Sequence, residues 1–221
     1  MEPALRQAAA GRGALGGAAA VSGRLIAVEG VDASGKSTQA RMLARSLGAE
    51  FTFQFGATGV GEVIRDLLLD PANDSVDDRT EALLIIADKA QHVAEIVGPA
   101  LEAGRDVVTD RFAGSTLAYQ GYGRGLDLGE LSAMMRFATG GLEPDLNVLM
   151  DLPSEQAWQR LGSSVDRFEG QGREFLDRVR NGYLALAAAD PGRWAVVDAA
   201  GTTDEVAARI LTAVRERLGN G

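Results

Sequence analysis

Short apolar runs alternate along the chain with longer stretches in which apolar residues recur every three or four positions. The runs have the length of buried strands and occur at 25–28, 51–55, 106–110, 145–152 and 194–198. The helical spacing predicts helices from Ser37 onward, over 63–68, 78–101, 115–119 and 128–138, from Ser154 onward, and over 174–189 and 204–218. Strands that alternate with helices favour a parallel sheet covered on both faces, so we expect a three-layer α/β/α fold with five parallel strands.

The first apolar run leads directly into a glycine-rich segment that matches G-x-x-x-x-G-K-[ST] without a mismatch. A strand before the motif and a helix after it are the context in which it binds phosphate, which favours a P-loop NTPase fold over a chance turn. Its two glycines let successive N–H groups converge on phosphate oxygens, the lysine reaches the β- and γ-phosphates, and the serine hydroxyl binds Mg²⁺. The predicted nucleotide-binding residues are Gly30, Val31, Asp32, Ala33, Ser34, Gly35, Lys36, Ser37 and Thr38.

A second group of polar residues leaves the third predicted strand, where the sequence reads Thr109-Asp110-Arg111-Phe112. The carboxyl ends of parallel strands are where such folds bind ligands. Asp110 is therefore a candidate partner of Mg²⁺, and Arg111 a candidate phosphate clamp. A salt-bridged surface pair is the alternative for this dipeptide taken alone.

Five segments together resemble the bacterial thymidylate kinase family. They are EGVDASGKSTQ, GEVIRDLLL (61–69), TEALLIIADKAQHV (80–93), TDRFAGSTLAYQGYGRGL (109–126) and DRFEGQGREFLDRVRNGYLALA (166–187). The resemblance runs from Arg24 to about Leu218, and the block after the third strand is far more specific than the P-loop. It implies that ATP phosphorylates dTMP to dTDP with Mg²⁺, and that the chain forms a homodimer.

The resemblance also implies roles for individual residues. Catalytic roles fall on Lys36, Asp110, Arg111, Arg160 and Arg167, the last two in a short helical lid over ATP, and metal binding falls on Ser37 and Asp110. The implied acceptor-binding residues are Asp32, Arg65, Ile85, Lys89, Arg111, Ser115, Thr116, Tyr119 and Gln120. Among them, Asp32 would approach the sugar 3′-hydroxyl, and Tyr119 would lie under the sugar where a 2′-hydroxyl would clash.

The chain departs from the family pattern on the acceptor side. The family usually carries Thr-Arg-Glu-Pro-Gly-Gly-Thr after the second strand, whereas residues 52–58 read TFQFGAT. Ile85 and Lys89 replace a phenylalanine and an arginine, and the lid at 161–165 is short. Two alternatives therefore stay open: a related nucleoside monophosphate or deoxynucleoside kinase with a shifted acceptor, and a P-loop nucleotide-binding protein with weakened catalysis.

Composition narrows the function classes. The 221 residues carry a net charge of −9, which argues against a broad nucleic-acid-binding face, because polyanions bind basic patches. The lack of cysteine excludes disulfides and thiolate chemistry and fits a cytoplasmic protein, and no apolar run reaches membrane-spanning length. We expect one kinase domain over 23–219, preceded over 1–22 by an Ala/Gly-rich flexible tail or by residues upstream of the functional start codon.

Several single residues have structural roles as their simplest interpretation. His92, the only histidine, is expected to pack in a helix rather than act as a base, and Trp158 and Trp194 are expected in the core. Glu29 and Glu169 each have two possible roles: to help hold Mg²⁺ or order the lid, or to make a structural hydrogen bond.

Overall fold

Five strands form a single parallel sheet in the computed structural model, which describes residues 23–73, 75–161 and 172–219. Across the sheet the order is β2-β3-β1-β4-β5. The strands are β1 (Leu25–Glu29), β2 (Glu50–Phe53), β3 (Val107–Asp110), β4 (Leu146–Asp151) and β5 (Trp194–Asp198). The predicted five-stranded parallel sheet is confirmed, although β2 ends before Gln54 instead of continuing to Phe55.

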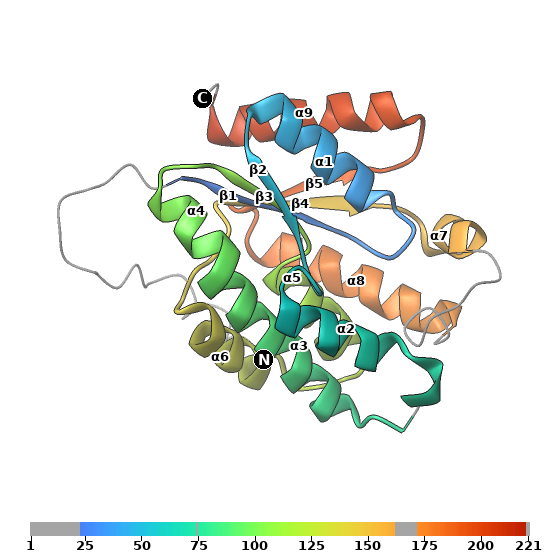
Figure 1. Cartoon of the computed structure of the whole chain (residues 1–221). Coiled ribbons are helices and arrows are strands. Elements are labelled where there is room, and N and C mark those ends of the chain that lie inside the picture. The colour runs from blue at the N-terminus through green and yellow to red at the C-terminus, as the bar shows by residue number, and fades with distance from the viewer. Residues whose placement is uncertain (1–22, 74, 162–171, 220–221) are drawn as a thin grey trace.

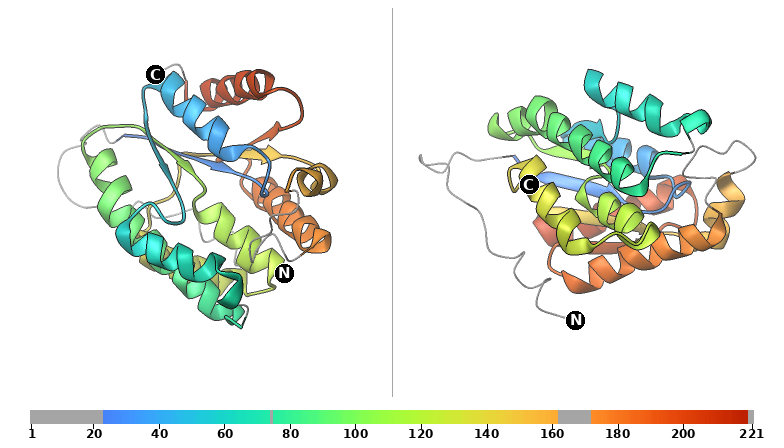
Figure 2. Two further views of the ribbon diagram at one scale, coloured as in Figure 1. Left: turned by 45° about the vertical axis from the view of Figure 1, so that its right-hand side comes forward. Right: turned by 90° about the horizontal axis from the view of Figure 1, so that it is seen from below.

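Helices cover both faces of this sheet, as expected for three α/β/α layers (Figure 1). One face carries α1 (Lys36–Leu47) and α9 (Thr203–Leu218). The other carries α3 (Asp78–His92), α4 (Gly98–Glu102), α5 (Ala113–Thr116), α6 (Leu128–Thr139) and α8 (Arg173–Ala189). Two more helices, α2 (Gly59–Leu69) and α7 (Ser154–Leu161), pack on α3 and α8 respectively, and Figure 2 shows the layers from two further sides.

The long helix predicted over 78–101 is continuous in the structure but changes its winding. A π-helical turn, η3 (Val93–Val97), joins α3 to α4, and the Gly98 N–H bonds the Val93 carbonyl. Pro99 follows at once, and proline has no N–H to donate to an α-helical ladder. The helix predicted at 115–119 likewise spans α5 and the π-helical segment η4 (Leu117–Gly123). In the described residues, no helix has both the length and the apolar character that a membrane span needs.

The core lies between the sheet and its two helical layers. All five residues of β1 are buried, as are Val107 and Val108 of β3. Trp194 is buried as expected, but the prediction for Trp158 is wrong, since 40% of it is exposed. The helix α7 lies at the periphery and buries Ala157, which turns the neighbouring Trp158 outward.

The order of the strands opens a crevice at the carboxyl ends of β1 and β3. These strands are neighbours, with Val28 paired to Asp110. The chain leaves β1 for α1 on one face of the sheet and leaves β3 for α5 on the other. Such a switch point is where open α/β sheets bind ligands. The tail at 1–22, the lid segment at 162–165, Arg167 and Glu169 lie outside the described residues.

Candidate active site

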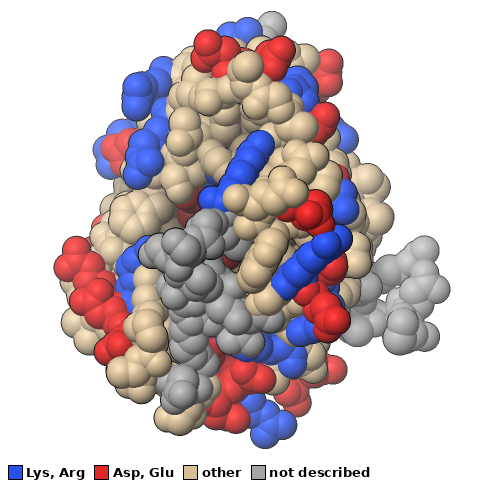
Figure 3. Space-filling view, turned by 90° about the vertical axis from the view of Figure 1, so that its right-hand side faces the viewer, with Lys and Arg blue, Asp and Glu red and all other residues tan. Residues whose placement is uncertain are grey.

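A pocket of about 580 Å³ occupies the crevice. Figure 3 shows the side of the molecule toward which the strands run, and several Lys and Arg side chains lie on it. Fifteen of the predicted site residues line the pocket: Asp32, Ala33, Gly35, Lys36, Ser37, Thr38, Arg65, Ile85, Lys89, Asp110, Arg111, Ser115, Thr116, Tyr119 and Gln120. The structure thus brings the predicted nucleotide loop and the predicted acceptor residues into one cavity, with Gly30, Val31 and Ser34 completing the loop outside the pocket lining.

The glycines of the loop have conformations that other residues rarely adopt. Gly30 has a φ of 147° and Gly35 a φ of 90°. A Cβ on Gly30 would lie 2.7 Å from the Met150 carbonyl oxygen, so the loop can pass the end of β4 only as glycine. These two positions let the chain curl tightly between β1 and α1, as phosphate-binding loops do.

Lys36 is held inside this loop. Its Nζ donates a 2.7 Å hydrogen bond to the Val31 carbonyl, and only 5% of the residue is exposed. Burial, with the nearby charge of Arg111, lowers the pKa of Lys36 to about 8 against the opposing pull of Asp32 and Asp110. The ammonium therefore stands ready for anionic oxygens that enter the loop.

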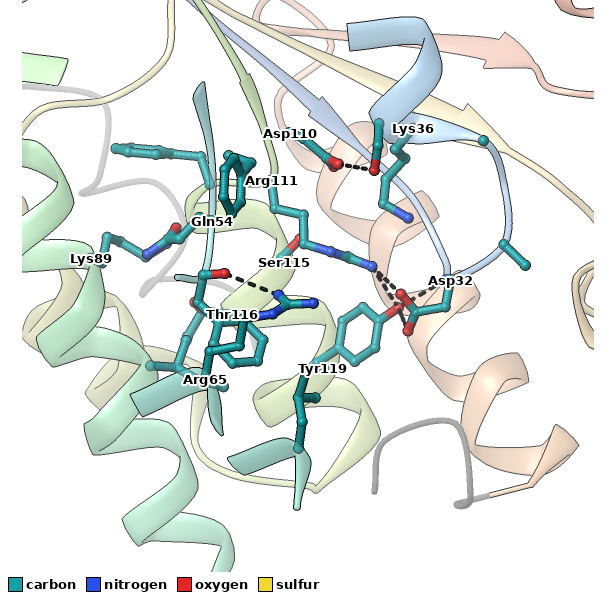
Figure 4. Close-up of a pocket in the computed structure, with 18 of the residues that line it drawn as sticks. Asp32, Lys36, Gln54, Arg65, Lys89, Asp110, Arg111, Ser115, Thr116 and Tyr119 are labelled. Carbon is teal, nitrogen blue, oxygen red and sulfur yellow. Dashed lines mark hydrogen bonds and ion pairs between the residues drawn. The ribbon is translucent and has the colours of Figure 1, made fainter. Parts of the chain in front are cut away.

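Ser37 and Asp110 offer oxygen ligands beside Lys36. The Ser37 hydroxyl donates to Asp110 Oδ2 at 2.5 Å, whereas the buried Oδ1 of Asp110 has no partner among the described residues (Figure 4). A buried, unsatisfied carboxylate oxygen is costly unless a cation or a donor completes it. Because Mg²⁺ prefers hard oxygen ligands, the two side chains fit the predicted metal site.

Arg111 connects the loop to the other half of the pocket. Figure 4 shows its guanidinium beside Asp32 and Tyr119. One nitrogen pairs with Asp32 Oδ1, and the other donates to the Gly30 carbonyl at 3.2 Å and to Ser115 Oγ at 3.1 Å. The Tyr119 hydroxyl donates to Asp32 Oδ2 at 2.6 Å and lies 3.4 Å from Arg111.

Asp32 stays ionised in this cluster. Burial by itself favours the neutral acid, but the charges of Arg111 and Lys36 and the hydrogen bonds from Tyr119 and Arg111 bring the pKa of Asp32 below its ordinary value. A permanent carboxylate at the centre of the pocket fixes the orientations of Arg111 and Tyr119.

Glu29 anchors the segment that carries Arg111. It is fully buried and accepts from the Phe112 N–H at 2.9 Å, from Ser115 Oγ at 2.5 Å and from the Tyr183 hydroxyl at 3.2 Å. A Cβ on Gly114 would lie 2.9 Å from Glu29 Oε1, so glycine permits this close approach. Of the two roles considered for Glu29, the structure shows the structural hydrogen bonds. Glu29 is not among the residues that line the pocket.

The far end of the pocket is built around a buried lysine. Lys89 is fully buried, donates to Gln54 Oε1, and lies with its Nζ 4.9 Å from the centre of the Phe112 ring. Gln54 in turn donates to Asp88 Oδ2 at 3.1 Å. Burial lowers the pKa of Lys89 to about 8, although Glu29 and Asp88 oppose the shift.

Three further predicted residues line this end, and they differ in how far their polar atoms are satisfied. Gln120 donates to Glu81 at 2.9 Å, and Arg65 donates to the Phe55 carbonyl at 3.0 Å. The buried hydroxyl of Thr116 has no partner among the described residues. It is therefore available to a polar group that enters the pocket.

His92 lies behind this wall, not among the residues that line the pocket. Its Nε2 is 2.7 Å from Thr52 Oγ1, and burial, together with the charge of Lys89, lowers its pKa to about 4. A neutral, buried histidine bonded to a strand residue agrees with the predicted packing role.

A family model described as thymidylate kinase matches residues 28–210. This chain belongs to the thymidylate kinase family. The match spans the loop after β1, the residues after β3 and helix α8. The expected family and the expected P-loop NTPase fold are therefore confirmed.

Individual members of the thymidylate kinase family agree with this result. The thymidylate kinase of Desulfosudis oleivorans is 44% identical over 203 residues, which cover 86% of this chain and 95% of that protein. That of Cereibacter sphaeroides is 46% identical over 204 residues, with 87% and 94% covered. The crystal structure of the Ehrlichia chaffeensis thymidylate kinase aligns with a TM-score of 0.73 at 28% identity, covering 87% of this chain and 99% of that one.

One lid arginine can be placed within this thymidylate kinase fold. Arg160, near the end of α7, lies outside the pocket lining but brings a guanidinium nitrogen to 3.5 Å from the Ala33 carbonyl of the loop. Arg167, its predicted partner, lies outside the described residues. Their catalytic roles stay predictions.

The sequence pattern does not identify several residues that line the site or bond its residues. Arg41 lines the pocket one helical turn after Ser37, a spacing that could have revealed it. Tyr183 accepts a hydrogen bond from Arg111, and Asp88 accepts one from Gln54. No local sequence pattern predicts either contact.

Proposed function

We propose that this chain transfers the γ-phosphoryl group of ATP to dTMP and releases dTDP and ADP. The observation that carries the proposal is the shared pocket, in which Asp32 of the phosphate-binding loop bonds Arg111 and Tyr119 on the acceptor side. Membership of the thymidylate kinase family supports the same reaction. Two anionic substrates can bind side by side in this pocket because lysine and arginine side chains line it.

On the donor side, the loop N–H groups and Lys36 bind the ATP phosphates. Lys36 exchanges its hydrogen bond to the Val31 carbonyl for bonds to β- and γ-phosphate oxygens. The negative charge of these oxygens raises the pKa that burial has lowered, so Lys36 stays protonated. Arg160, already beside Ala33, neutralises charge that develops on the transferred group. Ser37 and Asp110 would hold Mg²⁺, whose charge would reduce the repulsion among the phosphate groups.

On the acceptor side, Arg111 holds the dTMP phosphate in line with the γ-phosphoryl group. Asp32 accepts from the 3′-hydroxyl of the sugar, and Tyr119 packs where a ribose 2′-hydroxyl would stand. A phosphate oxygen is already ionised at neutral pH, so the reaction needs positioning and charge neutralisation but no protein base.

The proposal includes a homodimer that works in the cytoplasm. Family membership supports the dimer, and so do two large apolar side chains on the packed helices α3 and α6. Leu83 is 54% exposed and Phe137 is 91% exposed, and exposed apolar side chains that lie together are typical of protein–protein interfaces.

A coupled assay of ADP release with ATP, Mg²⁺ and dTMP tests the proposal. Lys36→Ala should remove a charge-assisted phosphate contact that tightens in the transition state, and so lower the rate by about 10² to 10⁴. Circular dichroism and a thermal melt verify that the variant is folded, and Arg45→Ala, an exposed change on the same helix, is the control. Full activity in folded Lys36→Ala protein would refute the proposed site.

A kinase with a shifted acceptor is the second candidate, because Phe53, Gln54 and Lys89 line the pocket and depart from the family pattern given in the sequence analysis. The same assay run with dTMP, dUMP, UMP and dGMP separates the two candidates. Highest kcat/KM with dTMP supports the first, and highest kcat/KM with another nucleotide supports the second. ATP binding without transfer to any of the four would indicate a nucleotide-binding protein with weakened catalysis.

A further inference from the structure

Arg41 brings to the pocket a positive charge that the proposed reaction does not yet use. It projects from α1 one helical turn after Ser37 and lines the cavity. Its guanidinium lies 4.9 Å from the centre of the Phe51 ring, and one nitrogen reaches the Ser37 carbonyl at a long 3.4 Å. Within residues 23–73, 75–161 and 172–219, no carboxylate pairs with it.

Three of the four other cations that line the pocket are more firmly engaged, and the fourth, Arg65, donates to the Phe55 carbonyl at 3.0 Å. Lys36 donates to the Val31 carbonyl at 2.7 Å, and Lys89 donates to Gln54. Arg111 is paired with Asp32 and bonds four further oxygens. A guanidinium carries five N–H donors in a planar fork. Most of those of Arg41 have no partner among the described residues, while the aromatic ring beneath it limits where the group can point.

The strand order places Arg41 on the acceptor side. Phe51 and Phe53 belong to the edge strand β2, and their rings stack with centres 6.5 Å apart. Phe53 pairs in register with Asp110, and it lines the same pocket as Arg41. The donor-side residue Arg160 follows β4, on the other side of β1.

We propose that Arg41 binds the phosphate of the acceptor nucleotide, moving from the Phe51 ring to the phosphate when the acceptor enters. The inference rests on the proposed phosphoryl transfer and adds a residue to its acceptor site. A planar guanidinium suits a phosphate because it can donate two parallel hydrogen bonds. Arg41 thereby supplies, from α1, the charge that Phe53 cannot supply from β2.

Calorimetric binding of dTMP and of thymidine, which lacks the phosphate, tests this role directly. In Arg41→Ala protein the affinity for dTMP should fall about tenfold to hundredfold, the range expected for a lost charge-assisted hydrogen bond. Thymidine affinity and the KM for ATP should stay within about twofold. Arg45→Ala, also basic and exposed on α1 but outside the pocket lining, should change none of them.

Two further variants separate phosphate binding from packing. Arg41→Lys keeps the charge without the fork and should bind dTMP with intermediate affinity. Phe53→Arg added to Arg41→Ala should restore much of the dTMP affinity, since position 53 faces the same cavity. An equal loss for dTMP and thymidine, a rise in the KM for ATP alone, or no change from wild type would each overturn the inference. Because binding is read without turnover, a wild-type protein inactive toward dTMP would refute the proposed function and leave this test intact.

Discussion

Two buried lysines predict an unusual dependence of activity on pH. Lys36 and Lys89 both line the pocket, and burial lowers the pKa of each to about 8. A lysine with that pKa is about nine-tenths protonated at pH 7 and about one-tenth protonated at pH 9. If each ammonium is needed for substrate binding, kcat/KM for dTMP should fall about tenfold per lysine over this range, and about a hundredfold for both.

The assay is the ratio kcat/KM measured from pH 7 to pH 9, since this ratio reports ionisations of the free enzyme. Phosphate groups with a second pKa of about 6 are already ionised throughout, so the substrates do not cause the decline. Bound phosphates raise the pKa of Lys36, so kcat should decline at a higher pH than kcat/KM.

Lys89→Arg is the diagnostic variant. Arginine stays charged at pH 9, so the variant should lose one of the two ionisations and decline by about tenfold instead of a hundredfold. The stability of the wild type should change in the opposite sense. Between about pH 8 and 10.5 the unfolded lysines hold more protons than the folded ones, so the free energy of unfolding rises with pH. A flat kcat/KM profile to pH 9 would refute the reasoning.

Three further outcomes follow from single contacts. Tyr119→Phe keeps the ring but removes the hydroxyl that bonds Asp32 at 2.6 Å, so steady-state kinetics should show kcat/KM reduced about tenfold or more with the preference for deoxyribose retained. Ser37→Ala removes a predicted ligand, and a Mg²⁺ titration of the rate should need about tenfold more metal for half-maximal activity, whereas an unchanged requirement would place the metal elsewhere. The pKa of His92 is about 4 in the folded chain, so urea unfolding should show stability falling as the pH drops from 6.5 towards 4, and His92→Asn should flatten that part of the curve.

The parts of the fold that depend on local sequence were predictable. The apolar runs gave all five strands, and the loop at 30–37 was recognisable because its chemistry lies within eight consecutive residues. Strand ends were less predictable: Phe55 continues the apolar pattern of β2, but the strand ends at Phe53, and Gln54 turns to Lys89 and Asp88. Trp158 was misassigned because spacing alone does not reveal that α7 lies at the edge of the molecule.

The partners that orient the site were not predictable, because they come from distant segments. Arg111 adopts a φ of 73°, and its guanidinium contacts Tyr183, which lies 72 residues further along the chain. Glu29 fixes the same segment through Phe112, 83 residues away. Composition and periodicity do not predict such contacts, because the contacts depend on how α8 packs against η4 and the sheet.

The acceptor-side departures are connected by physical constraints. Gln54 stands where the family pattern given in the sequence analysis implies a glutamate, and its amide nitrogen lies 3.1 Å from Asp88 Oδ2. A carboxylate in that place would put two negative charges side by side in a buried site, which is strongly unfavourable. The amide avoids this, because it donates to Asp88 while its oxygen accepts from Lys89.

The amide also changes the charge balance of the pocket. A neutral amide compensates the charge of the protonated Lys89 less than a glutamate would, so the lysine attracts an anionic ligand more strongly. On β2, Phe53 stands where the family pattern implies an arginine, and its ring stacks on that of Phe51, which lies beneath the guanidinium of Arg41. Arg41 from the neighbouring helix and the buried Lys89 thus supply the positive charge that position 53 lacks. The altered segment at 52–58 is therefore compatible with an acceptor that carries a phosphate.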